Sequence, residues 1–99
     1  MRVIVSFADK GTEDVFDGRT TKGARKACPS DLLRIARRKL DMLNQAAALG
    51  DLRVPPSNRL EKLRGDREGQ HSIRINDQWR VCFRWTESGA EDVEIVDYH

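Results

Sequence analysis

The chain has 99 residues, a formal net charge of +2, and 34% charged against 38% hydrophobic residues. This length supports one domain, spanning residues 1–99, and no apolar run approaches the roughly 20 residues that a membrane span needs. The short apolar run near the N-terminus is also too short for a signal-peptide core. Cys28 and Cys82 form neither a disulfide framework nor a metal-binding pattern, so we expect a cytoplasmic protein with two reduced thiols and no metal or cofactor.

Charge is distributed unevenly along the chain. Between Lys22 and Lys39 there are seven basic residues and one acidic residue, and between Arg53 and Arg84 there are eight basic and four acidic residues. After Trp85 there are five acidic residues and neither lysine nor arginine. Such blocks indicate a basic face and an acidic strand in one small fold, which suits a polyanionic partner; a solvated basic helix face is the more ordinary explanation.

The first part of the chain predicts a strand, a short helix and a loop. Arg2–Phe7 contains the β-branched run typical of a strand, and Asp9–Asp17 predicts a short helix that ends near Gly18. The following stretch, R-T-T-K-G-A-R-K-A-C-P, is broken by Gly23 and Pro29, so we expect a loop there.

The longest expected helix begins after Ser30, a residue type that caps helices, and ends at Gly50. Asp31 lies in its first turn, where the helix dipole favours an acidic side chain. One face carries an apolar stripe at helical spacing, made of Leu32, Ala36, Leu40, Leu43 and Ala47. The other face holds the basic residues Arg34, Arg37 and Arg38, with Lys39 as a further candidate.

A turn-rich crossing, D-L-R-V-P-P-S-N-R-L, should place Leu60 and Leu63 against the core. The stretch R-G-D-R-E-G (residues 64–69) then predicts a polar turn between short strands. The alternation in H-S-I-R-I-N-D-Q-W-R-V-C-F-R-W predicts a hairpin with one buried face. We expect His71, at the start of this hairpin, to be structural or to face solvent.

The register of the hairpin can be argued from its faces. A two-residue loop would place Arg74 opposite Trp79, on the apolar face, whereas a three-residue loop of residues 76–78 pairs Arg74 with Arg80 and keeps each face uniform. Two arginines that face each other are unfavourable unless an anion lies between them. Either Asp97 or Glu94 of the last strand neutralises them, or the site is kept for a phosphate.

The last predicted strand covers residues 92–98 and closes the sheet. The order of a strand, two helices and then a run of antiparallel strands predicts an α+β fold. In this fold an N-terminal strand precedes two helices that pack on one face of a curved, mostly antiparallel sheet.

The chain ends in D-Y-H, and these residues offer the parts for cutting RNA without a metal. Such a reaction needs a base for the ribose 2′-hydroxyl, an acid for the leaving 5′-oxygen, and cations for the phosphate. His99 titrates near neutral pH, Asp97 can act as a base or orient an imidazole, and Tyr98 offers a hydroxyl and a stacking ring. The guanidinium groups of Arg64, Arg74 and Arg80 can clamp a phosphate.

Two stretches carry a resemblance to a known family. R-L-E-K-L-R-G-D-R-E-G-Q-H-S-I-R-I-N-D-Q-W-R-V-C-F-R-W, and A-E-D-V-E-I-V-D-Y-H at the end, resemble the HigB-type toxins of the RelE superfamily, also called plasmid-maintenance killer proteins. The resemblance covers Arg59 to His99 closely and the preceding elements more loosely. It implies a RelE-like fold and a toxin that cleaves messenger RNA within the codon in the A site of the ribosome, without a metal. It also implies neutralisation by a HigA-like antitoxin with a helix-turn-helix domain, through which alone the toxin would reach operator DNA.

The resemblance implies roles for individual residues. The D-Y-H of the family falls on Asp97, Tyr98 and His99, its W-R arginine on Arg80, and its basic residue before G-D on Arg64. Other branches carry a His-Pro pair where this chain has Glu61 and Lys62, so either Glu61 takes over as proton acceptor or the C-terminal trio acts alone. The basic helix face of Arg34, Arg37 and Arg38 would lie against ribosomal RNA of the 70S ribosome.

Two other functions compete with this interpretation. A ParE-like toxin that inhibits gyrase would share the fold without the catalytic trio, so the D-Y-H residues would then be dispensable. A non-enzymatic nucleic-acid-binding or antitoxin-like module would use only the basic faces. The sequence contains no recognisable helix-turn-helix pattern, which argues against this alternative.

Overall fold

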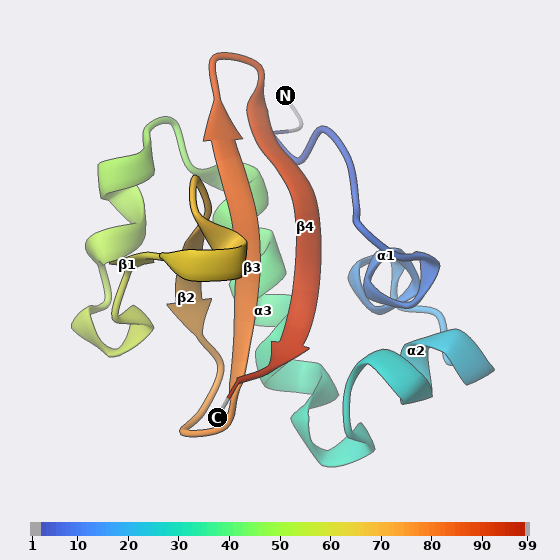
Figure 1. Cartoon of the computed structure of the whole chain (residues 1–99). Helices are drawn as coiled ribbons and strands as arrows, with labels where there is room; N and C mark the ends of the chain where they lie inside the picture. The colour runs from blue at the N-terminus through green and yellow to red at the C-terminus, as the bar shows by residue number, and fades with distance from the viewer. Residues whose placement is uncertain (1–2, 99) are drawn as a thin grey trace.

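The computed structural model describes residues 3–98. Its centre is an antiparallel sheet of four strands in chain order: β1 (Glu61–Lys62), β2 (His71–Arg74), β3 (Trp79–Thr86) and β4 (Gly89–Asp97). The α-helices are α1 (Lys10–Asp17), α2 (Lys22–Ala27) and α3 (Leu33–Gln45), and Figure 1 shows α3 behind the sheet. Within residues 3–98, no helix has the length and apolar character that crossing a membrane requires.

The hydrophobic core lies between the sheet and two of the helices. Val15 of α1 and Leu40 of α3 share one buried cluster with Ile73, Val81 and Phe83 of the sheet, and all five are fully buried. Both helices therefore cover the same face of the sheet, which confirms the predicted α+β arrangement. The opposite face is where polar side chains of β2 and β3 gather.

The predicted N-terminal strand does not form as a regular strand in its described part. Ile4 and Phe7 instead make isolated parallel bridges to Ala90 and Val93 of β4. The register of β4 against β3 shifts between these two bridges, and Asp92 has a φ of 53°. This bulge prevents a continuous ladder along β4, because it turns the backbone between the two bridges.

The helix predicted over residues 9–17 is confirmed, but the loop predicted after it is wrong. α1 begins at an Asp9 cap and ends at Gly18, which has a φ of 78°. α2 then forms because the Thr21 hydroxyl accepts a hydrogen bond from the backbone of its first turn and donates one to Asp14 Oδ2 at 2.7 Å. The two helices approach closely at a glycine, since a Cβ on Gly11 would lie 2.4 Å from a backbone oxygen of α2.

The long helix is shorter than predicted at both ends. Residues 30–32 form a 3₁₀ turn in which Ser30 makes no capping hydrogen bond, and α3 begins at Leu33. The helix ends at Gln45, so Gly50 lies inside a separate 3₁₀ helix, η2 (Leu49–Arg53). Ala36, Leu40 and Leu43 of the apolar stripe are buried as predicted. Leu32, in the 3₁₀ turn, is only partly buried, and at the other end Ala46 is buried in place of Ala47, which is exposed.

Lys39, a candidate for the solvent face of α3, is buried instead. Its Nζ donates a hydrogen bond to Asn58 Oδ1 at 2.6 Å. The Asn58 amide donates in turn to the carbonyl oxygens of Leu52 at 3.1 Å and Val54 at 3.4 Å. This network fastens residues 52–58 to α3 and thereby fixes the position of η2 beside the edge of the sheet.

Candidate catalytic site

Arg80 of β3 is the centre of a polar cluster on the face of the sheet opposite the helices. Its guanidinium donates to Ser72 Oγ at 2.9 Å, to Glu61 Oε1 at 3.2 Å and to the Arg59 carbonyl oxygen at 3.4 Å. The Arg80 side chain is 14% exposed, whereas that of Glu61 is 51% exposed. Partners from β1, β2 and the preceding loop therefore hold the guanidinium in one orientation, while its carboxylate partner stays accessible.

Tyr98 joins this cluster from the C-terminal end of β4. The Arg80 Cζ atom lies 5.6 Å from the centre of the Tyr98 ring, within the range of a cation–π contact. The Tyr98 backbone N–H donates to the Gln78 carbonyl oxygen at 2.6 Å, and the residue is 37% exposed. The structure therefore brings together Arg80, Glu61 and Tyr98, three of the predicted site residues.

Asp97 leaves the sheet on the other side from Arg80. It pairs with Trp79 across the β3–β4 ladder, one position away from the Arg80–Val96 pair, and residues that pair directly share a face. Its carboxylate oxygens accept hydrogen bonds from Gln78 Nε2 at 3.1 and 3.2 Å. His99, the third member of the predicted trio, lies outside the described residues.

Arg74 and Arg80 face each other across the hairpin, as the three-residue loop predicts. Each has its own acidic partner: Arg74 pairs with Asp77 and Arg80 with Glu61. The predicted role of Glu94 as their neutralising acid is wrong, because Glu94 pairs with a different arginine. The hairpin turn supplies Asp77 and β1 supplies Glu61, so in neither of these ion pairs does the acid come from the last strand.

The polar turn predicted between the short strands contains the 3₁₀ helix η4 (Gly65–Arg67), and Figure 1 shows this yellow segment crossing in front of β2 and β3. Arg67 anchors the turn, since its Nη1 lies 3.2 Å from Glu94 Oε1 and 3.1 Å from Gln70 Oε1. Arg64, one residue before η4, is exposed. Among residues 3–98 its side chain makes no hydrogen bond or ion pair, so Arg64 is available to a ligand.

Ser72 and Cys82 pair with each other on the face of the sheet that carries Arg80, away from the helices, and both are fully buried. Burial raises the pKa of the Cys82 thiol to about 11, so the thiol stays protonated at neutral pH. Cys82 is therefore no nucleophile. Ser72 supports the site because its hydroxyl oxygen accepts a hydrogen bond from Arg80. The alternation in the sequence predicts on which face Ser72 lies, but it does not predict this partner.

The basic residues of α3 lie away from the Arg80 cluster. Arg34 and Arg38 are exposed, while Arg37 is half-buried and its Nε donates to the Val15 carbonyl oxygen at 3.0 Å. The three arginines line a shallow groove of about 410 Å³ together with Asp41, Met42 and Gln45. Arg37 thus ties α3 to α1, and the other two present free cationic groups to solvent.

The Arg80 cluster has the chemistry of an anion site beside a carboxylate. A fixed guanidinium can hold a phosphate, an exposed carboxylate next to it can accept a proton, and an aromatic ring can stack on a base. Among residues 3–98, no group of three or more His, Cys, Asp or Glu side chains could hold a metal ion.

Residues 5–99 match the family described as "RelE-like toxin of type II toxin-antitoxin system HigB". The chain is similar to "Toxin HigB-1" of Vibrio cholerae serotype O1, with 37% identity over 86 residues that cover 87% of each protein. It is also similar to "Endoribonuclease HigB" of Proteus vulgaris, with 30% identity over 97 residues that cover 98% of this chain and all of the relative. A chain of the "YoeB-YefM complex from Staphylococcus aureus" shares the fold, with a TM-score of 0.58 at 15% identity over 100% of this chain and 98% of that one.

Proposed function

The chain belongs to the HigB-like family of RelE-like toxins, and on this premise we propose that it is an endoribonuclease that cuts messenger RNA on the translating ribosome. The cut falls within the codon in the A site and uses the 2′-hydroxyl of the message as nucleophile, without a metal. Loss of messages then stops translation and growth in the cytoplasm.

The observation that carries this proposal is the immobilised Arg80. Negative charge grows on the phosphate in the transition state, and a cation that is already oriented stabilises this charge without reorganisation. The contacts to Ser72, Glu61 and the Arg59 carbonyl provide that orientation. Arg64 and Arg74 lie at neighbouring positions from which they can reach other phosphates of the message.

The proton transfers are assigned to the acidic residues and the terminal histidine. Glu61 lies beside Arg80 and is half exposed, so it is placed to accept a proton from a 2′-hydroxyl next to the bound phosphate. Asp97 and His99 belong to the D-Y-H end that the family resemblance marks, with His99 as an acid for the leaving 5′-oxygen. Tyr98 offers its ring to the base that flanks the cut.

Few catalytic groups suffice if the ribosome supplies the geometry. Holding a nucleophile in line with its phosphate is worth many orders of magnitude in rate, so modest acids and bases can complete the reaction. The exposed Arg34 and Arg38 with Arg37 form a surface suited to ribosomal RNA, where phosphate contacts give affinity without sequence reading. A small set of catalytic groups together with a surface suited to ribosomal RNA supports ribosome dependence.

The partner that silences the toxin is proposed to be a HigA-like antitoxin with a helix-turn-helix domain. The family description of a type II toxin–antitoxin system supports a protein antitoxin. Contact with operator DNA would then occur only through that antitoxin.

The proposal is tested with purified chain, one model message, and mapping of 5′ ends with and without programmed 70S ribosomes. We expect cuts at A-site codons only when ribosomes are present. A message that stays intact in both conditions, together with DNA breaks in a gyrase reaction, would replace this proposal with a gyrase-inhibiting toxin.

A further inference from the structure

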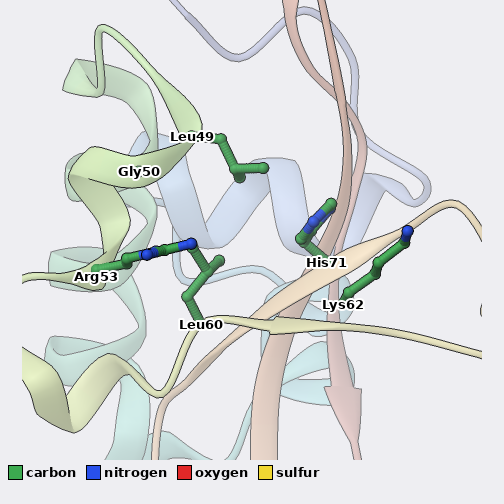
Figure 2. Close-up of a pocket in the computed structure, with 6 residues that line it drawn as sticks. All are labelled: Leu49, Gly50, Arg53, Leu60, Lys62 and His71. Carbon is green, nitrogen blue, oxygen red and sulfur yellow. The ribbon is translucent and has the colours of Figure 1, made fainter.

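A concave site lies at the edge of the sheet, on the side opposite the Arg80 cluster. This pocket has a volume of about 490 Å³ and is lined by Leu49, Gly50, Arg53, Leu60, Lys62 and His71. Figure 2 shows these residues arriving from η2, from the loop before β1, and from β1 and β2. Lys62 pairs with His71 in the β1–β2 ladder, one step from the Glu61–Ser72 pair, so the two pairs point to opposite faces.

Two cationic side chains from separate elements line this pocket. Figure 2 shows Arg53 reaching in from η2, and Lys62 extending from β1 on the other side of His71, with its ammonium group directed away from Arg53. The lining contains no acidic residue, and within residues 3–98 neither cation forms an ion pair. A cationic side chain without an acidic partner favours the binding of an anion, because the anion accepts its hydrogen bonds and neutralises its charge.

His71 adds a hydrogen-bond donor. Its Nδ1 is buried and has no hydrogen-bond partner among residues 3–98. Its ring stacks on Phe83 with centroids 6.3 Å apart and an interplanar angle of 25°. Burial, with a further contribution from the Lys62 charge, lowers the pKa of His71 below its ordinary value, so the ring is neutral at pH 7. A neutral ring carries one N–H, so the imidazole has one donor nitrogen and one acceptor nitrogen.

The remaining walls are apolar. Leu49 and Leu60 present aliphatic surface beside the imidazole ring, and both are partly buried against the core. The volume falls in the range of roughly 300–1,000 Å³ that is typical of small-molecule sites. The pocket therefore combines an anion-binding side with a flat apolar and aromatic side, and a phosphate joined to a sugar and base has this same combination.

We propose that this pocket binds one phosphate-bearing nucleotide unit of RNA, with the phosphate on Arg53 and Lys62 and the sugar and base against Leu49, Leu60 and His71. The choice of RNA as the source of the phosphate rests on the proposed function. An acidic peptide would use the two cations but would leave the imidazole ring and the two leucines without a planar partner.

The position of the pocket favours a strand of RNA that passes round the edge of the sheet. β1 is the edge strand and consists of Glu61 and Lys62. Glu61 lies on the side of the Arg80 cluster, and Lys62 lies on the side of the pocket. Arg59 and Arg64, which flank β1, are both exposed. Basic residues thus occur on both faces and on both sides of this edge strand, and the pocket would hold RNA beyond the nucleotides at the cut.

The test is a titration of the ¹⁵N-labelled full chain, followed by backbone amide shifts, with adenosine 5′-monophosphate, inorganic phosphate, adenosine and a hexaglutamate peptide as separate probes. The monophosphate should shift the amides of Gly50, Arg53, Lys62 and His71 and bind more tightly than phosphate or adenosine. Arg53→Gln or Lys62→Gln should each weaken its binding about tenfold, as expected for one charge-assisted contact. Lys26→Gln removes the same charge from an exposed position on α2 and should leave binding unchanged.

Three results would overturn the proposal. Amide shifts with the monophosphate that are confined to Arg80 and Tyr98 would place the nucleotide in the other site. Equal affinity for inorganic phosphate would show an anion site without nucleotide recognition. Tighter binding of the hexaglutamate peptide would indicate a protein interface. The titration contains no ribosome, so its outcome is separate from that of the cleavage assay. If cleavage occurs but the pocket binds nothing, only the pocket proposal fails.

Discussion

Removal of the Arg80 side chain should nearly abolish cleavage, and this loss of rate can be distinguished from a loss of stability. In Arg80→Ala the phosphate loses a preorganised cation, and the loss of one such donor from a transition-state site typically costs about 100- to 1,000-fold in rate. The same change leaves Ser72, which is fully buried, without its 2.9 Å partner, and an unsatisfied buried hydroxyl costs about 1–3 kcal/mol in the free energy of unfolding. Glu61 is 51% exposed, so its release costs little.

These two effects are measured by single-turnover cleavage on programmed ribosomes and by denaturant unfolding. In the double variant Ser72→Ala/Arg80→Ala the unpartnered hydroxyl is gone, so the free energy of unfolding should recover relative to Arg80→Ala while cleavage stays low. Arg84→Ala is the matched control, since Arg84 lies on the same strand, has a side chain that is 43% exposed, and forms a 3.6 Å ion pair with the exposed Asp92. Recovery of cleavage in the double variant, or an equal loss in Arg84→Ala, would refute a direct role of Arg80 at the phosphate.

Three further changes test other parts of the account. Thr21→Ala should lower the free energy of unfolding by about 1–2 kcal/mol in chemical denaturation, because α2 loses its cap; Thr20→Ala should have no effect. Burial lowers the pKa of Lys39 in the folded state, so the unfolded state binds the extra proton. The free energy of unfolding should therefore rise as pH increases through the folded pKa towards 10.5. Lys39→Met should flatten this part of the pH profile of unfolding, and an unchanged slope would contradict the prediction. Glu61→Gln should slow single-turnover cleavage at least tenfold as expected for loss of a general base, whereas a silent Glu61→Gln beside a slow Asp97→Asn would move the base to the C-terminal end.

The β2–β3 hairpin shows what local sequence can determine. Alternation fixes which residues share a face, and a uniform face on each strand leaves only the three-residue loop, so the Arg74–Arg80 pairing follows. The acidic partners did not follow from the same pattern. The bond between Arg80 and Glu61 joins residues 19 apart, and the path of the chain through η4 and β1 decides it.

The errors in the N-terminal half have a common physical cause. α2 has no apolar periodicity, and its stability comes from a threonine cap and from close contact with α1 at Gly11. Lys39 looks like a surface residue on a helical wheel, yet Asn58 from a distant turn accepts its hydrogen bond and permits its burial. Tertiary contacts that no short window contains determine both features.

The candidate site was partly predictable for the same reason. Arg80 and Tyr98 were identified and lie together, because a hairpin and the strand beside it bring them into register. The side taken by Asp97 depends on the bulge in β4, which shifts the register between Cys82 and Arg84 and which the strand pattern does not reveal. The pocket at His71 depends on where η2 packs, so the sequence marked its histidine only as structural or solvent-facing.

Single-turnover cleavage of one A-site codon in programmed 70S ribosomes tests the central claim most directly. Two messages are compared, one made only of ribonucleotides and one with a single 2′-deoxynucleotide on the 5′ side of the expected cut, each with and without ribosomes. Only the all-ribose message should be cut, and only on the ribosome. Cutting of free message at the same rate, or of the 2′-deoxy message at the substituted bond, would contradict a ribosome-dependent attack by the 2′-hydroxyl.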